Sequence, residues 1–214
     1  MDAIQELESY TMRVQRTWSR DSWAMWVAPA VALLALLLLS LANAASTPKD
    51  VRYEPTPYPT VRAMLELARV GPNDVVYDLG SGDGRIVIMA AKDFGARGVG
   101  VDIDSDLVKQ ARTNARKTGV EGKVTFVEGD MYQADLRQAT VVTLFLHPDP
   151  NLKLRPKLLS ELKPGSRVVS YIWDMGEWKP DAEQVVNDRD YKIYLWRIPQ
   201  PGAVASSAPP VPGK

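Results

Sequence analysis

The chain contains no cysteine, which excludes disulfide bonds, thiolate metal sites and cysteine nucleophiles. It has a single histidine, His147, so a metal site built from several histidines is excluded as well. Neither sign of charge is in excess, because Lys+Arg and Asp+Glu both number 26 and the formal net charge is zero. This balance gives no support for a broad nucleic-acid-binding face. We therefore expect no metal ion and no nucleic-acid partner.

Charged residues are missing from positions 22–48, and the centre of this stretch is strongly apolar. About 20 apolar residues in a helix cover a hydrocarbon core of roughly 30 Å. Trp18, Trp23 and Trp26 cluster at one end, as amphipathic rings do at a membrane interface. We expect a polar segment over 1–22 and a transmembrane helix over 23–42. A cleaved signal peptide, with small residues at 42–44, and a buried soluble helix are the alternatives.

The rest of the chain divides into a linker, a domain and a tail. Positions 43–59 are rich in proline, and residues before proline avoid helix, which predicts an extended linker. Apolar residues then recur with helical spacing from Val61 to Ala68, before a stop signal at Gly71 and Pro72. We expect a domain over 60–198. The tail, 199–214, has a Pro/Ala/Ser/Val/Gly composition that favours disorder.

Within the domain, short apolar runs alternate with helical patterns. Strands are predicted over 75–79, 98–101, 123–127, 140–146, 167–172 and 191–198, and helices over 84–94, 105–118 and 152–162. Such alternation is typical of an α/β fold with a mostly parallel sheet covered on both faces.

One glycine-rich segment indicates a ligand. Positions 75–85 read Val-Val-Tyr-Asp-Leu-Gly-Ser-Gly-Asp-Gly-Arg, an apolar strand, an acid and a turn that leads into a helix. The glycines allow a tight turn and the close approach of a ligand. A carboxylate at Asp78 would repel a pyrophosphate. S-adenosylmethionine (AdoMet) has no phosphate and carries a sulfonium and an amino-acid group, so the acid favours AdoMet over NAD.

Two further acids follow the next two strands. Asp102 lies about 20 residues after the glycine turn, where doubly wound sheets place an acceptor for ribose hydroxyls. Asp130 could accept from the adenine amino group, with Ile103 and Met131 on the two faces of the ring. The alternative for Asp102, Asp104 and Asp130 is helix capping, which is frequent at such turns. Asp83 and Arg85 are expected to cap a helix or to form an ion pair rather than to bind the cofactor.

Positions 78–85, 99–104 and 128–130, in this order and spacing, resemble the successive motifs of the class I AdoMet-dependent methyltransferases. More narrowly, Tyr-Asp-Leu-Gly-Ser-Gly-Asp-Gly-Arg-Ile-Val, the apolar N-terminal segment and the lead-in at 53–57 are similar to the membrane-anchored lysine methyltransferases related to the ATP synthase c-subunit and adenine nucleotide translocase enzymes. The resemblance implies a doubly wound, mostly parallel, seven-stranded Rossmann-like sheet. It also implies that Asp78, Gly80 and Gly82 contact the methionine part of the cofactor, Asp102 the ribose and Asp130 the adenine. The full set of expected cofactor-binding residues is Asp78, Leu79, Gly80, Ser81, Gly82, Gly84, Asp102, Ile103, Asp130 and Met131.

The acceptor is predicted to lie at the exit of the fourth strand. Many amino-methylating relatives carry Asn/Asp-Pro-Pro-Tyr/Phe there, whereas this chain reads His-Pro-Asp-Pro-Asn over 147–151, which argues against DNA bases and glutamine amides. Histidine exchanges a proton readily near neutral pH. Our hypothesis is that His147 and Asp149, with Asn151, form the catalytic acceptor site. A structural or a surface role for His147 is the alternative.

Three aromatic residues follow the fifth strand or end it: Tyr171, Trp173 and Trp178. They could line the acceptor channel, although packing in the core is the more frequent role of such residues. The leading interpretation is an AdoMet-dependent methyltransferase that is tethered to a membrane and acts on a protein lysine. The alternatives are methyl transfer to a small molecule or lipid, and a non-catalytic or polyamine-synthase-like AdoMet-binding domain.

The orientation in the membrane involves a conflict between two rules. Arginines at 13, 16 and 20 precede the apolar segment, against Lys49 and Arg52 after it, so the positive-inside rule weakly favours an inside N-terminus. That orientation would separate the domain from cytosolic AdoMet. We give the cofactor more weight and expect a single-pass protein whose catalytic domain faces the cytoplasm.

Overall fold

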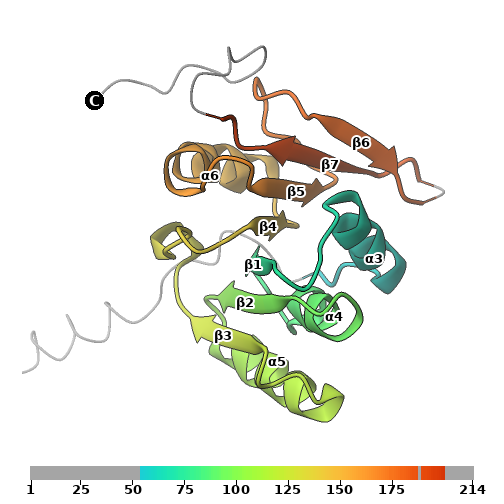
Figure 1. Cartoon of the computed structure of the whole chain (residues 1–214), viewed down its shortest axis with the longest axis vertical. Coiled ribbons are helices and arrows are strands. Elements are labelled where there is room, and N and C mark those ends of the chain that lie inside the picture. The colour runs from blue at the N-terminus through green and yellow to red at the C-terminus, as the bar shows by residue number, and fades with distance from the viewer. Residues whose placement is uncertain (1–53, 188, 201–214) are drawn as a thin grey trace, which may run out of the picture. The chain divides into compact units, whose positions relative to one another are not determined.

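The computed structural model describes residues 54–187 and 189–200, and the structural statements below concern these residues (Figure 1). The predicted segment 1–22, the predicted membrane helix, the linker up to residue 53 and the tail from residue 201 lie outside them. In the described part of the chain, no helix is long and apolar enough to cross a membrane.

The domain is built on one seven-stranded sheet with the order β3-β2-β1-β4-β5-β7-β6 (Figure 1). Its strands are β1 (Val75–Leu79), β2 (Arg97–Asp102), β3 (Val124–Glu128), β4 (Val141–Leu144), β5 (Arg167–Tyr171), β6 (Ala182–Val185) and β7 (Lys192–Arg197). The strands β1 to β5 run parallel, whereas β7 pairs antiparallel with both β5 and β6.

The sheet is therefore mixed: the prediction of a mostly parallel, seven-stranded sheet is confirmed by β1 to β5, and β6 and β7 add an antiparallel edge. Parallel neighbours require a crossover of a dozen or more residues, usually a helix. The short loop 186–191 joins β6 to β7 directly, so those strands form an antiparallel hairpin. The sequence did not predict β6, because three of its four residues are exposed and its pattern is polar.

Helices cover both faces of the sheet. They are α3 (Tyr58–Leu67), α4 (Arg85–Asp93), α5 (Ser105–Thr118) and α6 (Pro148–Glu161), with a 3₁₀ turn η1 (Met131–Gln133). The helices α3, α4 and α5 bury their apolar sides in one core with Val76 and Phe126. On the other face, α6 buries Leu154 and Leu158 in a second core with Trp196. The predicted ranges 75–79 and 105–118 coincide with β1 and α5.

Two helices begin earlier than the sequence suggested. The helix α3 starts at Tyr58, inside the expected linker, and α6 starts at Pro148 rather than at Leu152. Both have a proline in their first turn, where its fixed φ suits a helix and its missing N–H costs nothing.

The strand order reverses between β1 and β4, because β1 pairs with β2 on one side and with β4 on the other. In open α/β sheets, ligands bind at such a switch point, outside the carboxyl ends of the strands. The glycine turn, Asp102, Asp130 and His147 all follow strands that end at this edge.

Candidate active site

The glycine turn connects β1 to α4 and folds over the end of β2. The backbone N–H groups of Gly80 and Ser81 both donate to the carbonyl of Val101, at 2.8 and 3.0 Å. Gly84 has φ +81°, and a Cβ placed there would lie 2.5 Å from Cζ of the buried Phe126. Gly80, also at φ +81°, would bring a Cβ to 3.0 Å from Leu146 Cδ2. The turn therefore requires glycine at both positions, for reasons of space as well as of backbone conformation.

Asp78 lies at the base of this turn and is almost fully buried, with 3% of its surface exposed. Its carboxylate accepts a hydrogen bond from the hydroxyl of Thr143 on the adjacent strand β4, at 2.7 Å. Burial raises the pKa of Asp78 to about 7, and the negative charges of Asp102 and Asp83 add to this rise. A buried acid whose charged neighbours are also acids suits a cationic ligand, and the α-ammonium group of AdoMet is such a cation.

Asp102 joins the glycine turn to the exit of β2. One oxygen of its carboxylate accepts from the backbone of Gly82 at 2.7 Å, and the other accepts from the backbone of Asp104 at 2.9 Å. Asp104 in turn caps α5 through Asp106 N, so the capping alternative is confirmed for Asp104. Each oxygen of a carboxylate can accept a second hydrogen bond. The predicted role of Asp102 at the ribose, with Ile103 half-buried beside it, stays a prediction.

Asp130 follows β3 and lies next to the exit of β2, because Gly129 N donates to the Asp102 carbonyl at 2.9 Å. One oxygen of the Asp130 carboxylate accepts from Tyr132 N at 2.9 Å and caps η1, as the capping alternative predicted. Met131 is half-buried against the second core. The predicted adenine contacts of Asp130 and Met131 remain compatible with this arrangement and stay predictions.

Asp83 and Arg85 form the predicted ion pair, with Arg85 Nη2 donating to Asp83 Oδ2 at 2.7 Å. Arg85 Nη1 also donates to the carbonyl of Thr56 at 2.9 Å, and the guanidinium lies over the ring of Tyr58, 5.0 Å from its centroid. Arg85 thus fastens the lead-in of the domain to the start of α4. No spacing or periodicity in the sequence indicated this contact.

The segment 147–151, which lies between the predicted strand 140–146 and the predicted helix 152–162, forms the N-cap and first turn of α6. His147 and Asp149 are exposed, and the ring of His147 faces that of Trp173, with the centroids 6.2 Å apart. Asn151 is fully buried, and its amide nitrogen donates to Ser170 Oγ at 3.0 Å and to the carbonyl of Trp173 at 3.1 Å. Asn151 therefore holds the loop that follows β5, whereas His147 and Asp149 lie at the surface beside it.

Of the three aromatic residues at the end of β5 and after it, two are buried in the core, as the more frequent alternative predicted. Trp178 is 2% exposed, and its carbonyl accepts from Trp196 Nε1 at 2.7 Å. Tyr171 is 3% exposed and packs in the other core. Trp173 is half-buried and faces His147. The sequence analysis missed Thr143, although a single hydroxyl in the fully buried strand Val141–Leu144 was a usable signal.

Known proteins share both the motif and the fold. The ANTKMT methyltransferase domain matches residues 78–182. A protein-lysine N-methyltransferase of Saccharolobus islandicus is 46% identical over 151 residues, which cover 69% of this chain and 94% of that protein. The adenine nucleotide translocase lysine N-methyltransferase of Mus musculus is 36% identical over 148 residues, which cover 69% of this chain and 63% of that protein.

A solved structure is similar over an equal share of the chain. The crystal structure of an RNA methyltransferase from Salinibacter ruber in complex with S-adenosyl-L-homocysteine has 56% sequence identity and a TM-score of 0.66, and the match covers 69% of this chain and 95% of that one. The similarity to an S-adenosyl-L-homocysteine complex agrees with the acidic residues around Asp78 and with the glycine turn beside them.

Proposed function

Because the chain belongs to the ANTKMT methyltransferase domain family and is an AdoMet-dependent methyltransferase, we propose that it methylates the side-chain amine of a protein lysine from a membrane-anchored position. The observation that carries the lysine assignment is the 46% identity to a protein-lysine N-methyltransferase, of which this chain covers 94%. The mouse relative is also named for lysine methylation.

The residues of this chain have defined tasks in such a reaction. Asp78 would hold the ammonium group of the cofactor, the glycine turn would leave room for its amino-acid part, and Asp102 and Asp130 would hold the ribose and adenine. When bound, AdoMet supplies a methyl group on a sulfonium, so an N–CH₃ bond forms as the S–CH₃ bond breaks and its electron pair stays on sulfur. The remaining task of the protein is to align an amine that has already lost one proton to water.

We also propose that His147 and Asp149 contribute to the acceptor side. They lie exposed at the start of α6, directly after β4, and the ring of His147 faces Trp173. The test is to replace each by alanine and to measure AdoMet affinity and methylation rate. A slower methylation with unchanged affinity supports this role, and two unchanged quantities contradict it.

The membrane anchor is a proposal from the sequence. An uncharged stretch at 22–48, with three tryptophans clustered at its N-terminal end, supports a helix over 23–42, and the cofactor requirement supports a domain that faces the cytoplasm. Fractionation of cells that express the full chain should place it in membranes and leave it there after a high-salt wash. A reporter fused after Lys214 should remain inside, and its detection outside would reverse the orientation.

RNA is the second acceptor to test, because the similar Salinibacter ruber structure is titled an RNA methyltransferase. The zero net charge of this chain favours protein, since RNA-binding faces are generally basic. Full-length enzyme, membrane fractions and total RNA should be incubated with methyl-labelled AdoMet. Label in lysine of a protein supports the proposal, whereas label confined to RNA, lipid or small molecules overturns it.

A further inference from the structure

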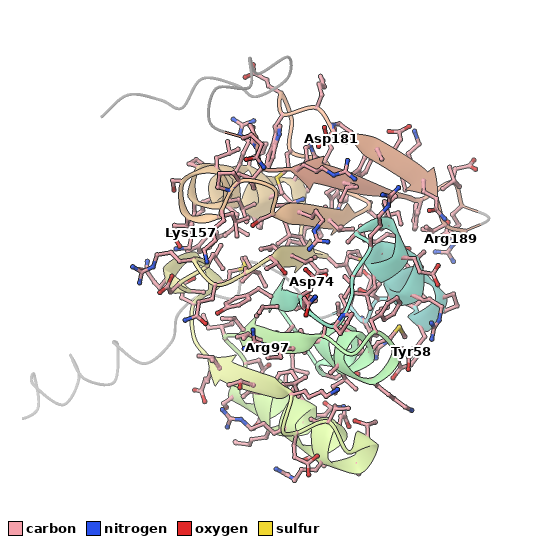
Figure 2. All side chains as sticks on the ribbon, in the orientation of Figure 1. Tyr58, Asp74, Arg97, Lys157, Asp181 and Arg189 are labelled. Carbon is pink, nitrogen blue, oxygen red and sulfur yellow. The ribbon has the colours of Figure 1, made fainter. Side chains whose placement is uncertain are left out.

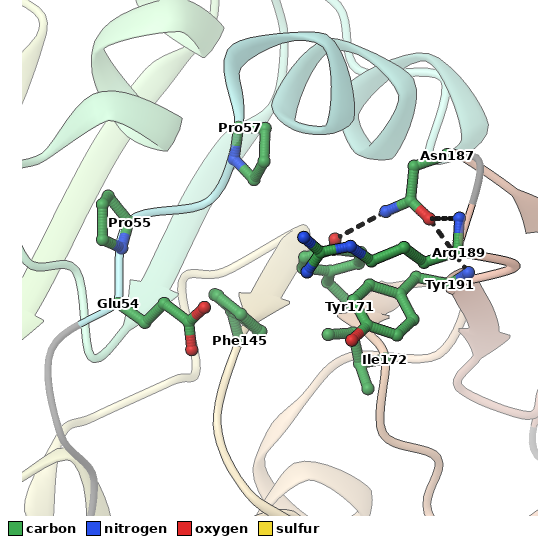
Figure 3. Close-up of a pocket in the computed structure, with 9 residues that line it drawn as sticks. All are labelled: Glu54, Pro55, Pro57, Phe145, Tyr171, Ile172, Asn187, Arg189 and Tyr191. Carbon is green, nitrogen blue, oxygen red and sulfur yellow. Dashed lines mark hydrogen bonds between the residues drawn. The ribbon is translucent and has the colours of Figure 1, made fainter.

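A pocket of about 340 Å³ is lined by residues that, apart from Tyr171, the sequence analysis did not assign to the site (Figure 3). Four segments of the chain line it: the lead-in of the domain, the exit of β4, the exit of β5, and the β6–β7 hairpin. Figure 2 labels Arg189 in the loop between β6 and β7, and Tyr58 at the start of α3. The pocket is on the same sheet edge as the glycine turn.

One wall of the pocket is a continuous row of three aromatic rings. The centroids of Phe145 and Tyr171 are 4.7 Å apart, and those of Tyr171 and Tyr191 are 6.2 Å apart with the rings nearly perpendicular. The hydroxyl of Tyr171 accepts a hydrogen bond from Asn187 Nδ2 at 3.1 Å, which fixes the middle ring. Aromatic faces of this kind pack against aliphatic chains and attract cations.

The lining of the pocket also includes one carboxylate, that of Glu54. Figure 3 shows the Glu54 side chain extending along the pocket beside Phe145. Burial raises the pKa of Tyr171, and the charges of Tyr191 and Glu54 contribute to the rise, so the Glu54 carboxylate lies within electrostatic range of the aromatic row. Arg189 lines the pocket from the hairpin and supplies donors for carbonyl groups.

The pocket is physically connected to the cofactor turn. Leu144 pairs with Leu79 across β4 and β1, and the next residue along β4 is Phe145, the first ring of the wall. On the other side, the Arg85 guanidinium holds the carbonyl of Thr56, which stands between the lining residues Pro55 and Pro57. The glycine turn and the walls of the pocket are thus fixed to each other at two points.

The floor of the pocket includes a strained residue. Ile172, directly after β5, has φ +70°, a left-handed conformation that β-branched side chains rarely adopt. Its N–H donates to the carbonyl of Lys192 at 2.8 Å. Such strain is concentrated at binding and catalytic sites.

We propose that this pocket receives the substrate lysine: the ring row packs its four-carbon stem, Glu54 binds its ammonium group on entry, and Arg189 binds carbonyl groups of the substrate backbone. This proposal rests on the proposed lysine methyltransferase function. It assigns a task to the lead-in at 54–57, which the sequence analysis noted without a role. Glu54 acts on binding of the charged amine, and the proton leaves to water before transfer.

The test uses the full-length chain, methyl-labelled AdoMet and poly-L-lysine as the acceptor. E54Q should raise the KM for poly-L-lysine about tenfold, with kcat changed by less than about twofold, because it removes an ion pair made in binding. Y191A should raise the KM in the same direction. E66Q is the matched control, since Glu66 is an exposed acid on α3 that does not line the pocket. Circular dichroism and thermal melting establish that each variant is folded.

The outcomes separate this proposal from the proposed function. If the unmodified enzyme labels no lysine in poly-L-lysine or in membrane proteins, the lysine methyltransferase function fails, and the pocket assignment fails with it. If lysine is labelled but E54Q leaves the acceptor KM unchanged, the pocket assignment alone is overturned. The same holds if E54Q weakens the binding of S-adenosyl-L-homocysteine instead, because the pocket would then belong to the cofactor.

Discussion

The carboxylate of Asp78 accepts a hydrogen bond from the hydroxyl of Thr143 at 2.7 Å, between residues that pair directly across the parallel strands β1 and β4. The hydroxyl holds the carboxylate in place but brings no positive charge. Burial raises the pKa of Asp78 to about 7, and the negative Asp102 and Asp83 act in the same direction. Asp78 is therefore a buried acid whose ionised form is disfavoured, and the ammonium group of the cofactor can balance its negative charge.

The first prediction concerns stability without cofactor. Because the folded pKa of Asp78 lies above the ordinary value, the folded state binds more protons than the unfolded state between about pH 4 and pH 7, and stability falls as the pH rises through this window. D78N removes this effect while its side-chain oxygen can still accept from Thr143. The variant should equal the unmodified protein near pH 4 and be more stable by roughly 1 to 4 kcal/mol at pH 7.5. Thermal melting of the full chain at several pH values checks this, and a D78N protein that melts lower at pH 7.5 contradicts it.

The second prediction concerns cofactor affinity. Only ionised Asp78 attracts the ligand ammonium, so affinity for S-adenosyl-L-homocysteine should rise roughly fivefold to tenfold between pH 6 and pH 7.5. That ligand lacks the sulfonium, which isolates the ammonium contact. D78N should bind at least about 100-fold more weakly at pH 7.5 and show no such rise. Isothermal titration calorimetry measures both, and a D78N protein with unchanged affinity would exclude Asp78 from the site.

Part of this site could be predicted from the sequence because it depends on local signals. The acid at Asp78, the glycines after it and Asp102 at the next strand exit follow from chain order and from the rule that ligands bind at the carboxyl edge. The contacts of Thr143 and Arg85 join residues far apart in the chain, so no motif or periodicity in the sequence indicates them. The same is true of the pocket, whose walls meet only when the β6–β7 hairpin folds back beside the lead-in.

The segment 147–151 shows why the acceptor side was harder to predict. The predicted helix began at Leu152, after the prolines at 148 and 150, but a proline in the first turn also suits a helix start, and α6 begins at Pro148. Once α6 begins at Pro148, Asn151 faces the core and His147 stays outside. Sequence alone cannot separate these two outcomes, because both satisfy the local preferences of proline.

This difference between Asn151 and His147 leads to the third prediction. N151A should lower the free energy of unfolding by about 1 to 3 kcal/mol, because it leaves the Trp173 carbonyl and Ser170 hydroxyl without their buried partner. H147A should change it by less than about 0.5 kcal/mol, since His147 is exposed and its side chain makes no capping hydrogen bond. Thermal melting distinguishes the two, and equal losses would show that His147 has a structural role.

The fourth prediction concerns the link from Arg85 to the lead-in. R85K keeps the positive charge beside Asp83 but cannot hold both the carboxylate and the Thr56 carbonyl with a planar fork. We expect the KM for the acceptor to rise about threefold to tenfold, while affinity for S-adenosyl-L-homocysteine changes less than about twofold. R62K, on the exposed side of α3, is the matched control. A loss confined to cofactor binding would show that Arg85 serves the glycine turn alone.

The fifth prediction concerns the space around Gly84. An alanine there would place its Cβ 2.5 Å from Phe126 Cζ and 2.9 Å from Ala111 Cβ, in a residue with φ +81°. Phe126 is a buried ring and Ala111 a buried helix residue, so neither can move freely. G84A should therefore lower the free energy of unfolding by about 2 to 5 kcal/mol, through overpacking and a left-handed alanine together.

G122A is the control, because nothing lies within 4 Å of a Cβ at that exposed glycine. The double variant G84A/F126L, with a smaller side chain opposite the new methyl group, should recover part of the loss in thermal melting. A G84A protein that melts like the unmodified chain would show that the turn tolerates a side chain, and no recovery in the double variant would assign the whole loss to the backbone conformation.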